Sequence, residues 1–132
     1  MRGNVSRMRV REEIMKSEVF GPQIEKLFPI ILPGKSDSAS MDMVVELLTH
    51  TGRSFPEIMM MMIPEAWEKH ATMSPERKAF YEYNACIMEP WDGPASVPFT
   101  DGDYVGALLD RNGLRPSRYT VTKSGKLIMS SE

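Results

Sequence analysis

Asp37 is the residue of this chain whose setting is best suited to chemistry. It follows Ser36 in a predicted loop, residues 34–40, that lies directly before a run of apolar residues with helical spacing. A carboxylate in such a place either caps the helix or projects into a cleft. From the residues alone, capping is the commoner role for an isolated aspartate.

A second candidate is the segment of residues 110–116, which reads Asp-Arg-Asn-Gly-Leu-Arg-Pro. Its Asn112-Gly113 pair, taken alone, predicts an ordinary hairpin turn. Arg111 and Arg115 flank the glycine, and a plain surface position is the simplest interpretation of Arg111. The full seven-residue string is far more specific than the turn that it contains.

The one cysteine suggests a nucleophile, with His50 or His70 as its base, but its position argues against that role. Cys86 falls inside a predicted helix, where an unpaired cysteine usually behaves as a small buried hydrophobic residue. No spacing indicates an activating partner. The histidines and the scattered carboxylates lack metal-ligand spacing, so no metal site is predicted.

Composition excludes several classes of protein. The chain has 132 residues, of which 42% are hydrophobic, enough for one domain with a core. A formal charge of −2 gives no overall attraction to nucleic acid or anionic lipid. The apolar run at residues 58–64 is far shorter than the roughly 20 residues of a membrane helix. We expect no nucleic-acid or membrane partner, no intrachain disulfide, and a location in the cytoplasm or an organelle.

Two other patterns have ordinary explanations. The methionines at 59–62 could form a pliable partner-binding surface, but consecutive apolar residues in a short helix more often indicate burial in the core. The arginines between Arg2 and Arg11 lack the interleaved aromatics of a single-strand binder, so a solvated helix face explains them.

The predicted elements are helices first and strands afterwards. An amphipathic helix is expected at residues 11–17, and an extended segment leading into a turn at residues 29–34. Further helices are expected from Met41 towards Gly52, from the Ser54 capping box towards Pro64, and from the Ser74 cap towards Met88. Short strands at residues 97–100, 104–109, 118–122 and 127–130 predict an antiparallel meander. This order is typical of the α+β class.

Three blocks of sequence carry a family resemblance: residues 36–40 (Ser-Asp-Ser-Ala-Ser), 90–94 (Pro-Trp-Asp-Gly-Pro) and 110–116. Together they resemble the glutamine-hydrolysing domain of glutamate synthase, a class II amidotransferase of the N-terminal-nucleophile type. The likeness covers residues 2–132. It implies that residues 1–132 are a fragment of a single amidotransferase domain, forming part of a four-layer α/β/β/α sandwich.

The resemblance also implies roles for the candidate residues. Asp37 would bind the α-ammonium group of L-glutamine through a charge-assisted hydrogen bond, in a loop shaped by Ser36 and Ser38. Arg111 and Arg115 would organise their loop and the site without taking part in chemistry. Residues 89–94 would build the fold, with Trp91 as a hydrophobic anchor.

In the resembling family the nucleophile is a cysteine at the first position, followed by an Asn-Gly oxyanion segment, whereas this chain begins Met1-Arg2. We therefore expect no catalytic residue in this chain and no activity from it alone. Ser6-Arg7 also departs from the Asn-Trp that commonly precedes Met8 in the family.

The full enzymes pass the released ammonia to 2-oxoglutarate at a synthase domain that holds FMN and an iron–sulfur cluster. The resemblance thus implies the remaining amidotransferase and synthase domains as partners, no cofactor in this segment, and a plastid location for a plant-type enzyme. Two alternatives stay open: a stand-alone glutamine-binding or regulatory module, and a methionine-rich helical interaction protein. A glutamine-binding titration separates them.

Overall fold

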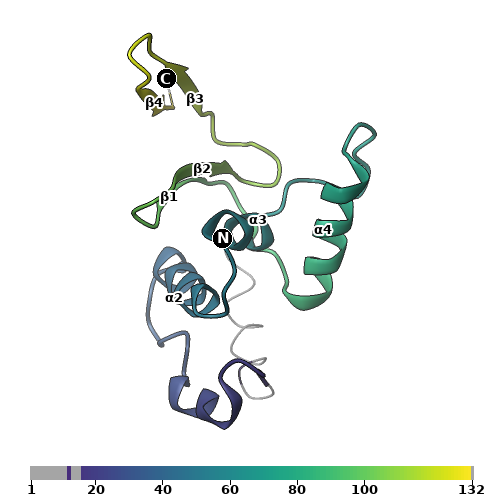
Figure 1. Ribbon diagram of the computed structural model, residues 1–132, viewed down its shortest axis with the longest axis vertical. Helices are drawn as coiled ribbons and strands as arrows, with labels where there is room; N and C mark the ends of the chain where they lie inside the picture. The colour runs from purple at the N-terminus through teal and green to yellow at the C-terminus, as the bar shows by residue number, and fades with distance from the viewer. Residues whose placement is uncertain (1–11, 13–15, 132) are drawn as a thin grey trace.

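The computed structural model describes residue 12 and residues 16–131. In the described part, helices precede strands, which confirms the predicted α+β class (Figure 1). The elements are the 3-10 helix η1 (Gly21–Leu27), the α-helices α2 (Asp37–Thr49), α3 (Phe55–Met62) and α4 (Pro75–Ile87), and the strands β1 (Ser96–Thr100), β2 (Val105–Leu109), β3 (Arg118–Val121) and β4 (Leu127–Ser130). The helix expected at residues 11–17 lies mainly outside the described residues, although Glu12 is helical.

Helix α2 begins earlier than predicted, so the expected loop at residues 34–40 is wrong for its second half. Ser36 is the N-cap, and its Oγ accepts a hydrogen bond from the Ala39 amide at 3.2 Å. The first helical bond runs from the Ser40 amide to the Ser36 carbonyl at 2.9 Å. The apolar spacing starts only at Met41, but the cap lets a polar first turn form without apolar contacts.

The starts of α3 and α4 are as predicted. The Ser54 amide donates to Glu57 Oε2 at 2.9 Å, as the capping box requires. Ser74 Oγ accepts from the Arg77 amide at 3.3 Å, and Pro75 follows as the first helical residue.

Helix α3 lies at the centre of the core. Ile58, Met59, Met61 and Met62 are buried and Met60 is half-buried, which confirms that this methionine run is core. The helix contacts α2, α4 and β2. Trp91 is 1% exposed, and its amide donates to the Met62 carbonyl at 2.6 Å. Trp91 is therefore buried in the core shortly after the end of α4, as expected of a hydrophobic anchor.

The hairpin of β1 and β2 packs on α3 through aromatic rings. Phe99 of β1 lies 5.4 Å from Phe55 of α3, measured between ring centroids. Gly106 of β2 pairs with Phe99, and a Cβ at this position would overlap the Phe99 ring. The glycine therefore lets the ring lie across β2 while it contacts α3.

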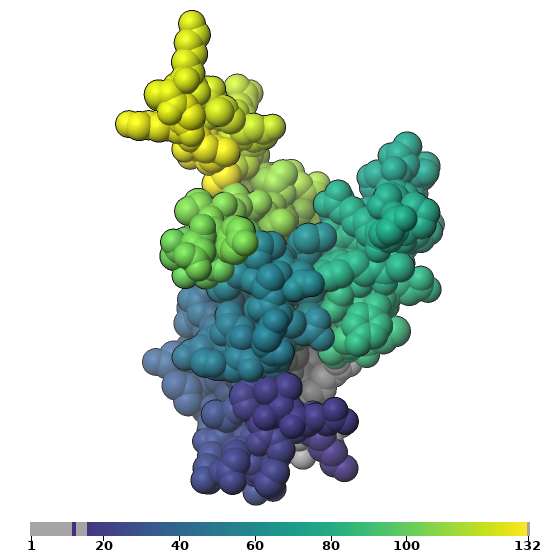
Figure 2. Space-filling model, in the orientation of Figure 1, coloured from purple at the N-terminus to yellow at the C-terminus, as the bar shows by residue number. Residues whose placement is uncertain are grey.

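The strands form two separate antiparallel hairpins, β1 with β2 and β3 with β4, so the predicted continuous meander is wrong. No residue of β3 or β4 is buried, and Tyr119 is 72% exposed. Figure 2 shows this hairpin projecting from the rest of the molecule. Turn signals predict where strands end, but they do not predict which neighbours pair.

The burial of α3 gives a first prediction. Met62→Ala is expected to lower the free energy of unfolding by about 2–4 kcal/mol, because it opens a cavity in the core. Met60→Ala, at a half-buried position of the same helix, should cost only about 1 kcal/mol. Urea titration of both variants measures the difference, and equal losses would contradict this description of the core.

Candidate functional site

The residues 36–38 form the first turn of α2. Ser36 caps the helix, and its Oγ also lies 3.2 Å from Ser38 Oγ, so the two serines do shape this turn. Asp37 is half-buried in the helix itself and does not lie in a preceding loop. Because Ser36 accepts the capping bond, the Asp37 carboxylate is not used as the cap. Among the described residues, no hydrogen bond or ion pair reaches that carboxylate.

Asp110 is a buried carboxylate that the sequence did not single out by itself. It is 6% exposed and follows β2 directly. Its Oδ1 accepts from the Asn112 amide at 3.0 Å and its Oδ2 from the Ala95 amide at 3.0 Å. The Leu114 amide donates to both oxygens, at 3.2 and 3.1 Å, and the Arg115 amide to Oδ2 at 3.4 Å. An aspartate two residues before Asn-Gly is a recognised turn signal and could have indicated it.

The electrostatics of Asp110 follow from these contacts. Burial raises the pKa of its carboxyl, but the amides of Ala95, Leu114, Asn112 and Arg115 outweigh burial and hold the pKa below the ordinary 3.8. Gly113 completes the loop at φ +60°, a left-handed conformation that glycine adopts without strain.

Arg111 joins this loop to the helices. Its side chain is 28% exposed, and its guanidinium pairs with Glu68 Oε1 at 2.5 Å. The Arg111 hydrogen bond lowers the pKa of the Glu68 carboxyl. Arg111 also lines a cavity of about 110 Å³ between the loop and α4, together with Tyr81 and Asn84. Arg115 is exposed on the same loop.

The structure brings the two arginines onto one loop but does not bring them to Asp37. Figure 1 shows α2 and the connection from β2 to β3 on opposite sides of α3. In the described part of the chain, no hydrogen bond or ion pair links residues 36–38 to Arg111 or Arg115.

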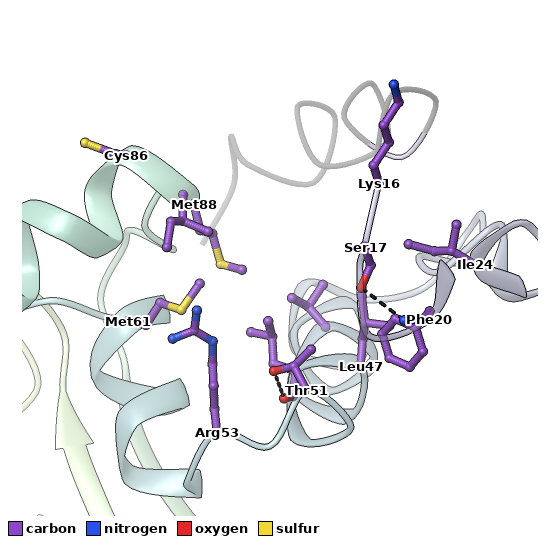
Figure 3. Close-up of a pocket in the computed structure, with 13 residues that line it drawn as sticks. Lys16, Ser17, Phe20, Ile24, Leu47, Thr51, Arg53, Met61, Cys86 and Met88 are labelled. Atoms are coloured by element: carbon purple, nitrogen blue, oxygen red, sulfur yellow. Dashed lines mark hydrogen bonds between the residues drawn. The ribbon is translucent and has the colours of Figure 1, made fainter. Parts of the chain in front are cut away.

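A pocket with a volume of about 560 Å³ lies elsewhere, between η1, α2 and the end of α4 (Figure 3). Most of its lining is apolar, and Lys16 and Arg53 are its cationic residues. The residues that line it are Lys16, Ser17, Phe20, Ile24, Val44, Leu47, Leu48, Thr51, Arg53, Met61, Cys86, Ile87 and Met88. None of the predicted site residues lines it.

The prediction that Cys86 is buried is wrong. The residue lies in α4 as expected, but it is exposed instead of buried, with Sγ 3.5 Å from the Glu82 carbonyl. Figure 3 shows its sulfur directed away from the centre of the pocket. His50 and His70 are exposed and have no described contact with it. Position 86 falls on the face of α4 that turns away from the core, which helical position alone did not reveal.

The family profile described as glutamine amidotransferases class-II matches residues 1–132. The chain belongs to this family. It is 54% identical over 133 residues to glutamate synthase (NADH) of Saccharomyces cerevisiae, a match that covers 100% of this chain and 6% of that protein. It is 49% identical to the glutamate synthase (NADPH) large chain of Bacillus subtilis, over 100% of this chain and 9% of that protein.

A third relative of this amidotransferase chain is the ferredoxin-dependent glutamate synthase of Antithamnion sp., 48% identical over 98% of the chain and 9% of that protein. The chain thus spans between 6% and 9% of the length of these relatives. The names of the three relatives specify NADH, NADPH and ferredoxin, respectively.

The donor set of this amidotransferase chain does not fit an iron–sulfur cluster, because one cysteine in 132 residues cannot supply the thiolates. Across residue 12 and residues 16–131, no group of three or more His, Cys, Asp or Glu side chains could hold a metal ion. No helix in that part of the chain is long and apolar enough to cross a membrane.

Asp110 gives a prediction about pH. Because its pKa is lowered in the folded state, its contribution to stability is complete above the ordinary value of 3.8 and disappears as pH falls through the folded value. Asp110→Asn should cost about 2 kcal/mol at pH 7, since an amide N–H₂ then faces backbone donors. The difference between wild type and variant in urea titrations should vanish well below pH 3.8. A constant difference at every pH would contradict the assignment.

Proposed function

We propose that this chain is part of the glutaminase domain of a glutamate synthase. That domain hydrolyses L-glutamine to glutamate and ammonia, and the ammonia is transferred to 2-oxoglutarate in glutamate biosynthesis. Support comes from the family match over the whole chain and from relatives named as glutamate synthases. The exposed faces of both hairpins support a place for residues 1–132 within a larger four-layer α/β/β/α sandwich, because uncovered apolar strands favour further packing.

The proposal for glutamine binding rests on the observation that the Asp37 carboxylate does not cap α2. Ser36 satisfies the helix start, and the Asp37 carboxylate stays half-buried with no described donor. A carboxylate so placed suits an ammonium group, with which it forms a charge-assisted hydrogen bond of about 1.5–3 kcal/mol. Asp37 therefore binds the α-ammonium of glutamine, and Ser36 and Ser38 hold the turn. Arg111 and Arg115 organise the second loop.

The chemical step uses groups outside these 132 residues. A cysteine thiolate attacks the carboxamide carbon of glutamine, the C–N bond breaks, ammonia leaves, and water hydrolyses the thioester to glutamate. The oxyanion formed on attack needs preorganised donors. Cys86 cannot serve, because it is an internal residue and therefore has no α-amino group of its own to relay the proton.

The electron-transfer groups of the whole enzyme, FMN and an iron–sulfur cluster, bind to other parts of it. The enzyme resides in the cytoplasm or a plastid, and the plastid alternative is supported by the relative named as chloroplastic in Arabidopsis thaliana, 44% identical over 135 residues.

The 132-residue chain alone is expected to release no ammonia from L-glutamine above background, since it lacks both nucleophile and oxyanion donors. A coupled ammonia assay, with Cys86→Ala as the control variant, measures this. Hydrolysis that disappears in Cys86→Ala would contradict the proposal. Tight glutamine binding by the inactive chain would instead favour a stand-alone binding module.

In a glutaminase that contains these residues, Asp37→Asn is expected to lower kcat/KM for glutamine at least tenfold, about 1.4 kcal/mol, because the charge opposite the substrate ammonium is lost. Asp42→Asn is the matched control, since Asp42 is exposed on the same helix. Steady-state kinetics of both variants make the comparison. If Asp37→Asn had the same kcat/KM as Asp42→Asn, Asp37 would be only an acidic residue in the first turn that stabilises α2.

A further inference from the structure

An arginine is directed into the pocket of about 560 Å³ between η1, α2 and the end of α4 (Figure 3). Arg53 lies in the connection between α2 and α3 and is half-buried, and its guanidinium extends towards Met61 and Met88. Lys16, the other cation of the lining, is exposed and directed away from the pocket. Arg53 therefore places one positive charge against a mainly apolar lining.

The Arg53 guanidinium keeps its donors for a ligand. Across residue 12 and residues 16–131, no hydrogen bond or ion pair reaches it. Glu57, four residues further on, uses Oε2 to accept the amide and the hydroxyl of Ser54 at 2.9 and 2.7 Å. These Ser54 bonds lower the pKa of the Glu57 carboxyl more than the charge of Arg53 does. Glu57 is thus committed to the cap of α3 and does not neutralise the arginine.

The other polar groups of the lining are used within the protein or are directed elsewhere. Thr51 Oγ1 donates to the Leu48 carbonyl at 2.6 Å, and Ser17 Oγ accepts from the Phe20 amide at 3.3 Å. The Cys86 sulfur is directed away from the centre of the pocket. Recognition in this pocket therefore depends on one cation and on apolar contacts.

We propose that this pocket binds a small amphipathic carboxylate, whose charged head pairs with Arg53 and whose hydrocarbon body packs on the apolar lining. A guanidinium holds a carboxylate through two parallel, charge-assisted hydrogen bonds. The thioethers of Met61 and Met88 are flexible and adapt to the shape of the body. The volume lies within the range of small-molecule sites, about 300–1,000 Å³.

This site is separate from the proposed glutamine site. Asp37 is the first residue of α2, whereas Thr51 and Arg53 follow its last residue, Thr49. A helix rises about 1.5 Å per residue, so the two ends of α2 lie roughly 18 Å apart. A ligand on Arg53 is therefore not the glutamine bound by Asp37, and the inference does not rest on the proposed function.

The test compares hexanoate with 1-hexanol, which has the same body without the charge. Methionine-methyl NMR follows both titrations in the glutamate synthase polypeptide that contains these residues. Hexanoate should shift the Met61 and Met88 signals and bind at least about tenfold more tightly than hexanol, because only the carboxylate pairs with Arg53. Met129 of β4 does not line the pocket, and its signal should stay unchanged.

Arg53→Gln should bind hexanoate and hexanol almost equally. Arg118→Gln is the matched control, because Arg118 is exposed on β3 and does not line the pocket, and it should keep the full preference for hexanoate. Acetate, which has the carboxylate without the body, should bind the unmodified protein at least about tenfold more weakly than hexanoate.

Equal affinities for hexanoate and hexanol in the unmodified protein would overturn the proposal, and so would an undiminished preference in Arg53→Gln. Unchanged Met61 and Met88 signals would also overturn it, as expected if another segment of the polypeptide fills the pocket. If Arg53→Gln does not fold, the comparison of the ligands in the unmodified protein still decides. None of these outcomes depends on glutaminase activity.

Discussion

The burial of α3 is the constraint on which the other described elements depend. This short helix contacts α2, α4 and β2, and its buried residues are Ile58, Met59, Met61 and Met62. Flexible thioether side chains fill the irregular space between elements that approach from different directions. The bond from the Trp91 amide to the Met62 carbonyl then fixes where the chain leaves α4 and enters β1. Both α2 and the β1–β2 hairpin pack against α3, so its burial sets the surface that they share.

The two candidate regions differ in how they are held. Residues 36–38 depend on a helix cap, in which a serine satisfies the backbone and leaves its neighbouring carboxylate without a described partner. Residues 110–116 depend on a buried carboxylate whose hydrogen bonds are all to backbone amides. The first arrangement makes a carboxylate available for a ligand, whereas the second consumes one to build a loop. This difference is the reason that Asp37, and not Asp110, is proposed as the residue that binds a ligand.

Local signals in the sequence predicted most of the elements, because caps and turns are local. Ser54 with Glu57, and Ser74 with Pro75, marked helix starts that the structure confirms. Apolar spacing begins only at Met41 and therefore predicts a start of α2 that is too late, whereas Ser36 caps the helix before Asp37. The pairing of the strands and the exposure of Cys86 were missed, since both depend on contacts between distant segments. The roles of Asp37, Ser36, Ser38, Arg111 and Arg115 towards glutamine came from family resemblance and stay predictions.

The central claim is that Asp37 recognises the α-ammonium group of glutamine, and a comparison of two ligands tests it most directly. Calorimetric titration of a glutaminase that contains these residues, with its nucleophile replaced so that no ligand is consumed, would compare L-glutamine with glutaramic acid, which lacks the ammonium. The account predicts that the wild type binds glutamine at least about tenfold more tightly, and that Asp37→Asn binds the two ligands almost equally. An undiminished preference for glutamine in Asp37→Asn would contradict it.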